Sequence, residues 1–97
     1  MAGYFMIRST NVRDQQAFEE YAKLWAPIAE KYRAKFIAGR GVRHETREGD
    51  DYPRNLIVQF SSYEQALACY DDPDYKVALD MAQKAYEHRE LVIVESC

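Results

Sequence analysis

Several features on which whole classes of protein depend are scarce in this sequence. Its 97 residues include only two cysteines, two histidines, four glycines and three prolines. Two cysteines are too few for a disulfide framework, and no set of Cys, His, Asp or Glu has metal-ligand spacing. No apolar run approaches the ~20 residues of a membrane span, and no signal-peptide pattern is present. We therefore expect a reducing, cytoplasmic setting with no membrane partner, no metal and no cofactor.

Positive charge is scarce as well. The chain has 13 Lys and Arg against 16 Asp and Glu, which gives a formal net charge of −3. Nucleic-acid-binding proteins neutralise phosphates with clustered basic residues, and here the basic residues are scattered. We expect no nucleic-acid partner. The length allows one domain, residues 1–97, with a modest core.

The chain does contain an ordered alternation of strand-like and helix-like segments. The predicted strands are residues 4–8, 36–48, 56–60 and 91–94. Apolar residues at steps of three and four predict a helix from Asp14 to about Tyr32, and a second helical region after Ser61 or Ser62. The order β-α-β-β-α-β indicates an α+β, ferredoxin-like fold, in which a four-stranded antiparallel sheet carries its helices on one face.

Three local signals predict interruptions of these elements. Pro27 lies inside the first helical pattern and predicts a kink or a break there. Gly39 and Gly41 interrupt the second strand, which indicates a bulge or a close backbone approach. Asp72-Pro73 divides the second helical region, because Asp is a good N-cap and Pro suits the first helical position.

The expected sheet has one face that the helices leave uncovered. The first, third and fourth strands are apolar on both sides, so this face would expose several hundred Å² of apolar surface, which monomers rarely do. We therefore expect a second copy of the chain to cover it, sheet against sheet, in a two-fold homodimer.

Short motifs along nearly the whole chain carry a family resemblance. They are Gly3-Tyr4, Lys35 to Ala38, Arg40-Gly41, Glu48-Gly49-Asp50, Arg54 to Phe60, Cys69-Tyr70, Asp72 to Tyr75 and Leu91 to Glu95. Together they resemble domain-of-unknown-function family 1330 of the dimeric α/β-barrel superfamily. The sequence departs from that pattern at Val42, Gln59 and Ala82, where the family tends to have Gly, an acidic residue and Arg.

The resemblance implies a dimeric α/β barrel and a homodimer, and no settled reaction. The superfamily includes cofactor-free monooxygenases of aromatic compounds, lactone isomerases and haem-binding enzymes, which use the cavity between sheet and helices. Because these proteins share no single catalytic set, the resemblance gives function only by analogy.

Three residues spaced by four could share one side of the second strand. Arg40 could bind a carboxylate with its planar fork of donors, His44 could act as a general base, and Glu48 could orient it. His44 is the best catalytic candidate. The alternative is a solvated hairpin end, because the intervening side chains are also charged.

Three further side chains are candidates for ligand binding. Gln59 lies in a strand that should be buried, and a buried amide needs partners. Tyr70 and Tyr75 flank Asp72-Pro73, and tyrosine offers an apolar body with one polar tip. The alternatives are an interface amide for Gln59 and core packing for the two tyrosines.

Two functions remain open from the sequence. The first is a homodimer that binds a small carboxylate or aromatic metabolite between sheet and helices, with possible cofactor-free acid–base or oxygen chemistry. The second is a non-catalytic dimeric module for binding or assembly. A polar cavity of roughly 300 Å³ or more, lined by Arg40, Gln59 and tyrosines, favours the first, and a solidly packed interior favours the second.

Overall fold

A computed structural model describes all residues, 1–97. Its elements are β1 (Gly3–Ser9), α1 (Gln15–Lys31), β2 (Lys35–Ala38), β3 (Arg54–Phe60), α2 (Tyr63–Asp71), α3 (Pro73–Ala85) and β4 (Arg89–Glu95). The β-α-β-β-α-β order predicted from the sequence is confirmed, with the second helical region divided into α2 and α3. No helix has both the length and the apolar character needed to cross a membrane.

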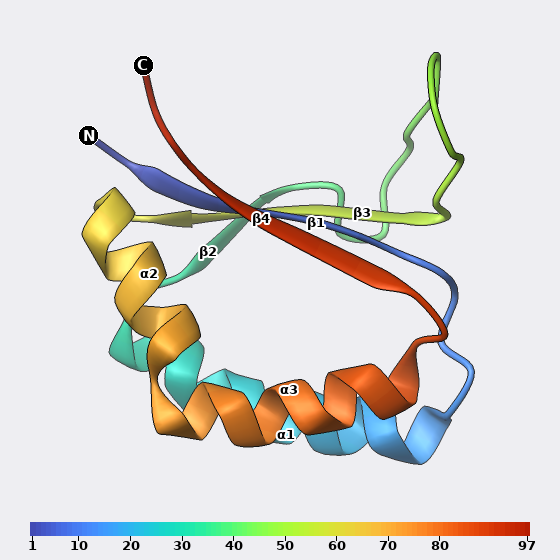
Figure 1. Cartoon of the computed structure of the whole chain (residues 1–97), viewed down its shortest axis with the longest axis horizontal. Coiled ribbons are helices and arrows are strands. Elements are labelled where there is room, and N and C mark those ends of the chain that lie inside the picture. The colour runs from blue at the N-terminus through green and yellow to red at the C-terminus, as the bar shows by residue number, and fades with distance from the viewer.

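The four strands form one antiparallel sheet in the order β2-β3-β1-β4. Figure 1 shows that α1 and α3 lie side by side beneath one face of this sheet, while α2 connects the sheet to the helical layer. Strand alternation explains the two faces. In β1 the side chains of Phe5, Ile7 and Ser9 are buried toward the helices, whereas Met6 between them is 43% exposed on the other face.

The predicted helix starts are confirmed at three side chains. Asp14 accepts a hydrogen bond from the backbone N–H of Ala17, and Ser62 accepts one from Gln65. Asp72 accepts one from Asp74 and is followed by Pro73 at the start of α3. Ser62, rather than Ser61, is therefore the cap of α2.

Two predictions about element boundaries were wrong. The second strand was expected over residues 36–48, but β2 ends at Ala38 and no strand forms between Gly39 and Pro53. At Pro27 a kink or a break was expected, and the break is absent, since α1 runs from Gln15 to Lys31 with Pro27 inside it. The predicted irregularity near Gly39 is confirmed: the β2–β3 register shifts between Phe36 and Ala38, and Gly39 has φ +85°.

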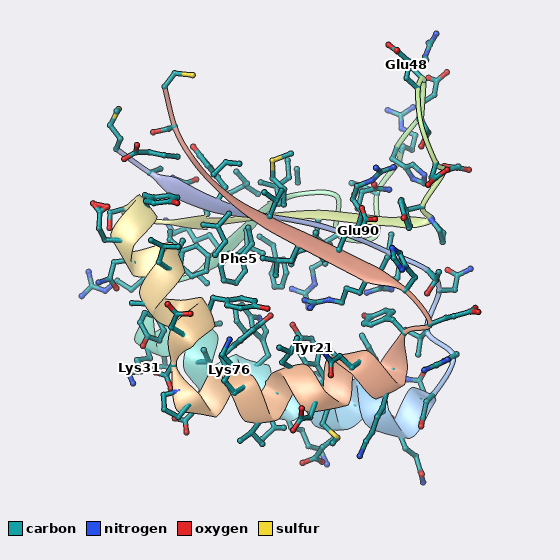
Figure 2. All side chains as sticks on the ribbon, viewed as in Figure 1. Phe5, Tyr21, Lys31, Glu48, Lys76 and Glu90 are labelled. Atoms are coloured by element: carbon teal, nitrogen blue, oxygen red, sulfur yellow. The ribbon has the colours of Figure 1, made fainter.

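The core lies between the sheet and the helices. Its fully buried side chains include Phe5, Val58, Phe60, Cys69 and Tyr75. Aromatic contacts link the layers, with the ring of Phe5 4.6 Å from that of Phe60 and 6.2 Å from that of Tyr75. Figure 2 places Phe5 in this layer, and places Glu48 on a loop that projects from the opposite face of the sheet.

A candidate anion-binding cavity

The interior between sheet and helices is not completely filled. A cavity of about 300 Å³ lies there, between β1, β3 and β4 on one side and α1 on the other. Sixteen residues line it, and twelve of them are hydrophobic. A volume of this order fits the lower end of small-molecule sites in proteins.

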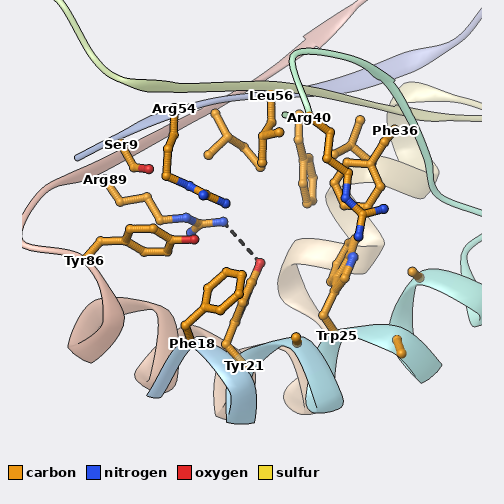
Figure 3. A pocket seen from close by; sticks show the side chains of 16 residues that line it. Ser9, Phe18, Tyr21, Trp25, Phe36, Arg40, Arg54, Leu56, Tyr86 and Arg89 are labelled. Carbon is orange, nitrogen blue, oxygen red and sulfur yellow. Dashed lines mark hydrogen bonds between the residues drawn. The ribbon is translucent and has the colours of Figure 1, made fainter. Parts of the chain in front are cut away.

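Two arginines lie together at the inner end of the cavity. Arg54 begins β3 and Arg89 begins β4, and both side chains point into the cavity (Figure 3). One guanidinium nitrogen of Arg89 donates a hydrogen bond of 3.3 Å to the hydroxyl oxygen of Tyr21 on α1. The buried Nε of Arg54 has no hydrogen-bond partner. Arg54 therefore keeps a buried N–H donor that no group of the protein accepts.

Aromatic side chains form the walls of this inner end. The guanidinium carbon of Arg54 lies 5.5 Å from the ring centres of both Phe18 and Tyr86. Those two rings meet edge to face at 6.4 Å. The walls thus place apolar surface beside a positive charge, which lowers the local dielectric and strengthens the interaction of this charge with any anion that enters.

The other end of the cavity is open to solvent. Arg40 stands there, exposed, with its guanidinium carbon 4.4 Å from the ring centre of Phe36. Trp25 contributes an aromatic wall on the α1 side, as Figure 3 shows. A ligand entering from this end would meet Arg40 first and the Arg54–Arg89 pair last.

No acid or base faces these three arginines inside the cavity. None of the sixteen lining residues is Asp, Glu, His, Lys or Cys. Tyr21, and Tyr75 behind it, stay protonated near neutral pH, because burial raises the pKa of both hydroxyls. The cavity is consequently rich in hydrogen-bond donors and positive charge, with no carboxylate to neutralise them.

The structure places the predicted ligand-binding residues in three different surroundings. Arg40 lines the cavity. Gln59 points to the opposite face of the sheet, where it pairs across strands with Tyr4. Tyr70 and Tyr75 belong to the core packing between α2, α3 and the sheet, with their ring centres 5.1 Å apart. Of these four, only Arg40 lines the cavity.

His44, the candidate base, lies outside the cavity. It belongs to the loop between β2 and β3, and its Nε2 is 3.5 Å from the carboxylate of Asp51. It faces a second hollow on the uncovered side of the sheet, together with Arg8 and Glu90. Because residues 39–53 are not a strand, the expected alignment of Arg40, His44 and Glu48 on one strand face does not occur.

The sequence contained a signal for the arginines that its interpretation missed. Arg54 stands two residues before Leu56, and Arg89 two residues before Leu91, so each is in phase with the inward-facing apolar side chains of its strand. A charged residue in an inward position of a strand is unusual and indicates a polar interior site. Tyr21 carried no such signal, since it fits the apolar stripe of its helix.

The fold and the cavity define a ferredoxin-like α+β protein with an arginine-lined internal site. The model of the family described as Domain of unknown function (DUF1330) matches residues 2–97. The chain belongs to this family, as the motifs in its sequence predicted. A comparison with curated proteins found no match.

Solved structures share the fold at low sequence identity. A protein of unknown function from Rhodopseudomonas palustris has a TM-score of 0.71 at 14% identity, covering 99% of this chain and 82% of that one. A dimeric ferredoxin-like protein of unknown function from Jannaschia sp. CCS1 has a TM-score of 0.70 at 12% identity, with 99% and 100% covered. A candidate antibiotic biosynthesis monooxygenase from Nitrosomonas europaea has a TM-score of 0.58 at 15% identity, with 98% and 88% covered.

Proposed function

We propose that the cavity binds a small organic anion with an apolar or aromatic body. One observation carries this proposal: three arginines line a mostly apolar cavity that contains no carboxylate, and the buried Nε of Arg54 has no partner. A buried donor without a partner is costly and is usually satisfied by a ligand, an ion or water. The anion of a ligand would satisfy both the donor and the charge.

The lining residues also restrict the shape of the ligand. Guanidinium groups bind planar oxyanions such as carboxylates with directional hydrogen bonds. Phe18, Trp25 and Leu56 offer apolar surface beyond the arginines. The best match is a molecule with one anionic head at the inner end and a flat or alkyl body that extends toward Arg40.

The cavity supports binding more directly than it supports catalysis. It holds no side chain that could accept a proton at neutral pH, and His44 lies in the loop on the other side of the sheet. Acid–base chemistry by a residue of the cavity is therefore not part of the proposal. The alternative function, a non-catalytic dimeric module, is favoured if no anion binds.

The homodimer is part of the same proposal. On the face of the sheet away from the helices, Met6 is 43% exposed and Val92 is 54% exposed. Large exposed apolar patches mark interaction sites, and dimeric relatives with the same fold exist. A second copy packed on this face would cover both side chains and leave the cavity, on the opposite side of the sheet, accessible.

The direct experiment is calorimetric titration of the protein with benzoate and phenylacetate. We expect binding that weakens at least about tenfold in the Arg54→Met variant, since charged hydrogen bonds contribute about 1.5–3 kcal/mol. The same variant should melt at an equal or higher temperature without ligand, because it removes an unpaired buried donor.

Arg47→Met is the matched control for this experiment. It makes the same substitution at an exposed loop arginine that pairs with Glu45, far from the cavity. It should bind benzoate as the unmodified protein does. Equal binding by the Arg54→Met and Arg47→Met variants, or no binding of either acid to the unmodified protein, would overturn the proposal.

A further inference from the structure

The donor groups at the inner end of the cavity come from three different elements and converge on one place. Arg54 comes from β3, Arg89 from β4 and Tyr21 from α1, and a 3.3 Å hydrogen bond joins the last two (Figure 3). The hydroxyl of Tyr21 accepts that bond, so its own proton remains available for donation. A single oxygen placed among these groups would receive hydrogen bonds from more than one direction.

The remaining polar groups near this place offer no general base. Those that line the cavity are Ser9 of β1, Arg40 of the loop after β2, Trp25 of α1 and Tyr86 after α3. The hydroxyl of Tyr75 on α3 lies behind Arg89 and Tyr21, and burial raises its pKa, so it stays protonated. The hydroxyl of Ser9 already donates to the carbonyl oxygen of Thr10. No carboxylate, imidazole or thiol is present to take a proton from a bound ligand.

Resting on the proposed function, we infer that the inner end of the cavity binds an acidic phenol or enol as its oxyanion. The O–H bond of the ligand breaks, its proton leaves to solvent water, and its electron pair stays on the oxygen that faces Arg54. The site thereby produces an electron-rich anion without a base of its own. The substrate class is a hydroxy-aromatic or enolic compound that ionises near neutral pH.

Electrostatics supports the preference for the anion. A positive charge within about 4–6 Å of an ionisable acid lowers its pKa by about 1–3 units. Here Arg54 and Arg89 both point into the inner end, and no negative group opposes them. The rings of Phe18 and Tyr86 place apolar surface beside Arg54, which lowers the local dielectric and makes the interaction with the anion stronger than at the surface.

The test uses 4-nitrophenol, whose ionised form absorbs visible light while its neutral form does not. The absorbance of this phenol is titrated with pH, free and in the presence of saturating protein. We expect the pKa of the bound phenol to lie about one to two units below that of free 4-nitrophenol. When benzoate displaces the phenol from the protein, the pKa should return to that of the free compound. The displacement step requires no variant, so the test does not depend on whether any variant folds.

Two variants test whether Arg54 causes the pKa shift of the bound phenol. Arg54→Met should remove the pKa shift of the bound phenol, and Arg54→Lys should retain part of it, because lysine keeps the charge and loses the fork of donors. The Arg47→Met control should behave as the unmodified protein. In addition, 4-nitroanisole, which has no ionisable hydroxyl, should bind more weakly than 4-nitrophenol.

The outcomes separate this inference from the proposed function. If 4-nitrophenol binds with its pKa unchanged or raised, the oxyanion inference is wrong, and benzoate binding still supports the anion cavity. If benzoate binds but 4-nitrophenol does not, the site takes carboxylates and the phenol class is excluded. If neither compound binds, the proposed function itself fails.

Discussion

Arg54 and Asp72 are charged side chains that differ in how completely the protein satisfies their hydrogen bonds. The buried carboxylate of Asp72 accepts hydrogen bonds from Lys31 at 2.8 Å, from the hydroxyl of Tyr32 at 2.6 Å and from the backbone N–H of Asp74 at 2.8 Å. The guanidinium of Arg54 keeps a buried nitrogen with no partner at all. Asp72 therefore stabilises the folded chain, whereas Arg54 is suited to a partner from outside it.

Asp72 should dominate the acid limb of the stability curve. Its hydrogen bonds with Lys31, Tyr32 and the N–H of Asp74 lower its pKa to about 2 in the folded state, below its value in an unfolded chain. The stability it contributes is therefore fully present above about pH 4 and is lost as the pH falls toward 2. In Asp72→Asn we expect a lower melting temperature at pH 7 and a smaller further loss between pH 4 and 2.

Melting curves of both proteins at pH 7, 4, 3 and 2 check this prediction. Asparagine keeps the capping oxygen, so the start of α3 should survive in the variant. Parallel losses in the two proteins over the acid range would show that other carboxylates control that limb.

Gly39 is a position where a positive φ and a close backbone contact together require glycine. Its φ is +85°, and a Cβ added there would collide with the backbone carbonyl of Asn55. Gly41 has a similar φ of +70° and open space around it. We expect Gly39→Ala to destabilise by about 2–4 kcal/mol and Gly41→Ala by only about 1 kcal/mol, as measured by urea unfolding. Equal effects would mean that φ alone, and not the contact with Asn55, decides the cost.

At the scale of elements, α1 shows how far local signals determine the chain. The apolar stripe was sufficient to predict that this helix forms, and Asp14 was sufficient to predict where it starts. Pro27 signalled a kink or a break, and no break occurs, because buried Ile28 and partly buried Leu24 hold the second half of the helix against the core. Tertiary packing outweighs the local cost of proline here.

Replacing Pro27 should therefore stabilise the protein. Proline inside a helix destabilises the folded state by about 3 kcal/mol. Its replacement also makes the unfolded chain more flexible, which favours the unfolded state by about 1 kcal/mol. We expect Pro27→Ala to raise the free energy of unfolding by about 2 kcal/mol in a urea titration. Pro27 is exposed, so no core contact is lost. A lower unfolding free energy would show that the ring of Pro27 shapes the helix in a way the fold needs.

The order of elements could be predicted from the sequence, and one of their lengths could not. Hydrophobic periodicity and the capping signals at Ser61 or Ser62 and at Asp72 were sufficient for the ferredoxin-like fold, and the structure selects Ser62 as the cap of α2. The second strand was predicted too long because residues 40–48 contain no proline to end it. Its end depends on Gly39, whose contact with the backbone of β3 is a property of the assembled sheet.

At the scale of the whole molecule, the two faces of the sheet have different roles. The covered face bounds the arginine-lined cavity, and the uncovered face exposes Met6 and Val92. We expect Val92→Lys to convert the proposed homodimer into a monomer, since an unpaired lysine buried in an apolar interface is strongly unfavourable. Mass measurement in solution by light scattering checks this.

Val77→Lys is the control for the dimer. Val77 is 55% exposed, about as much as Val92, but it lies on α3 in the helical layer. This variant should keep the mass of the unmodified protein. A monomeric unmodified protein, or equal masses for both variants, would contradict a dimer formed through the sheet.

The site was less predictable than the fold. Arg40, predicted as a ligand-binding side chain, lines the cavity, but Gln59 could be assigned to either sheet face only after the register with β1 was known. The cavity itself is a space between layers, and its volume depends on how far α1 lies from the sheet. No pattern within one element encodes that distance. Charged residues at inward strand positions, such as Arg54 and Arg89, were the accessible clue.

Trp25 is the single tryptophan of the chain, and it forms part of the cavity wall beside Phe36 and Arg40. Its ring centre lies 6.0 Å from that of the buried Tyr75. The tryptophan fluorescence of each chain, excited selectively over its eight tyrosines, therefore originates from one indole, at the place where a ligand would pass. The molecule is in effect a label-free optical sensor of its own occupancy. Large compound collections can be screened by tryptophan emission alone, with no assay designed for a particular reaction.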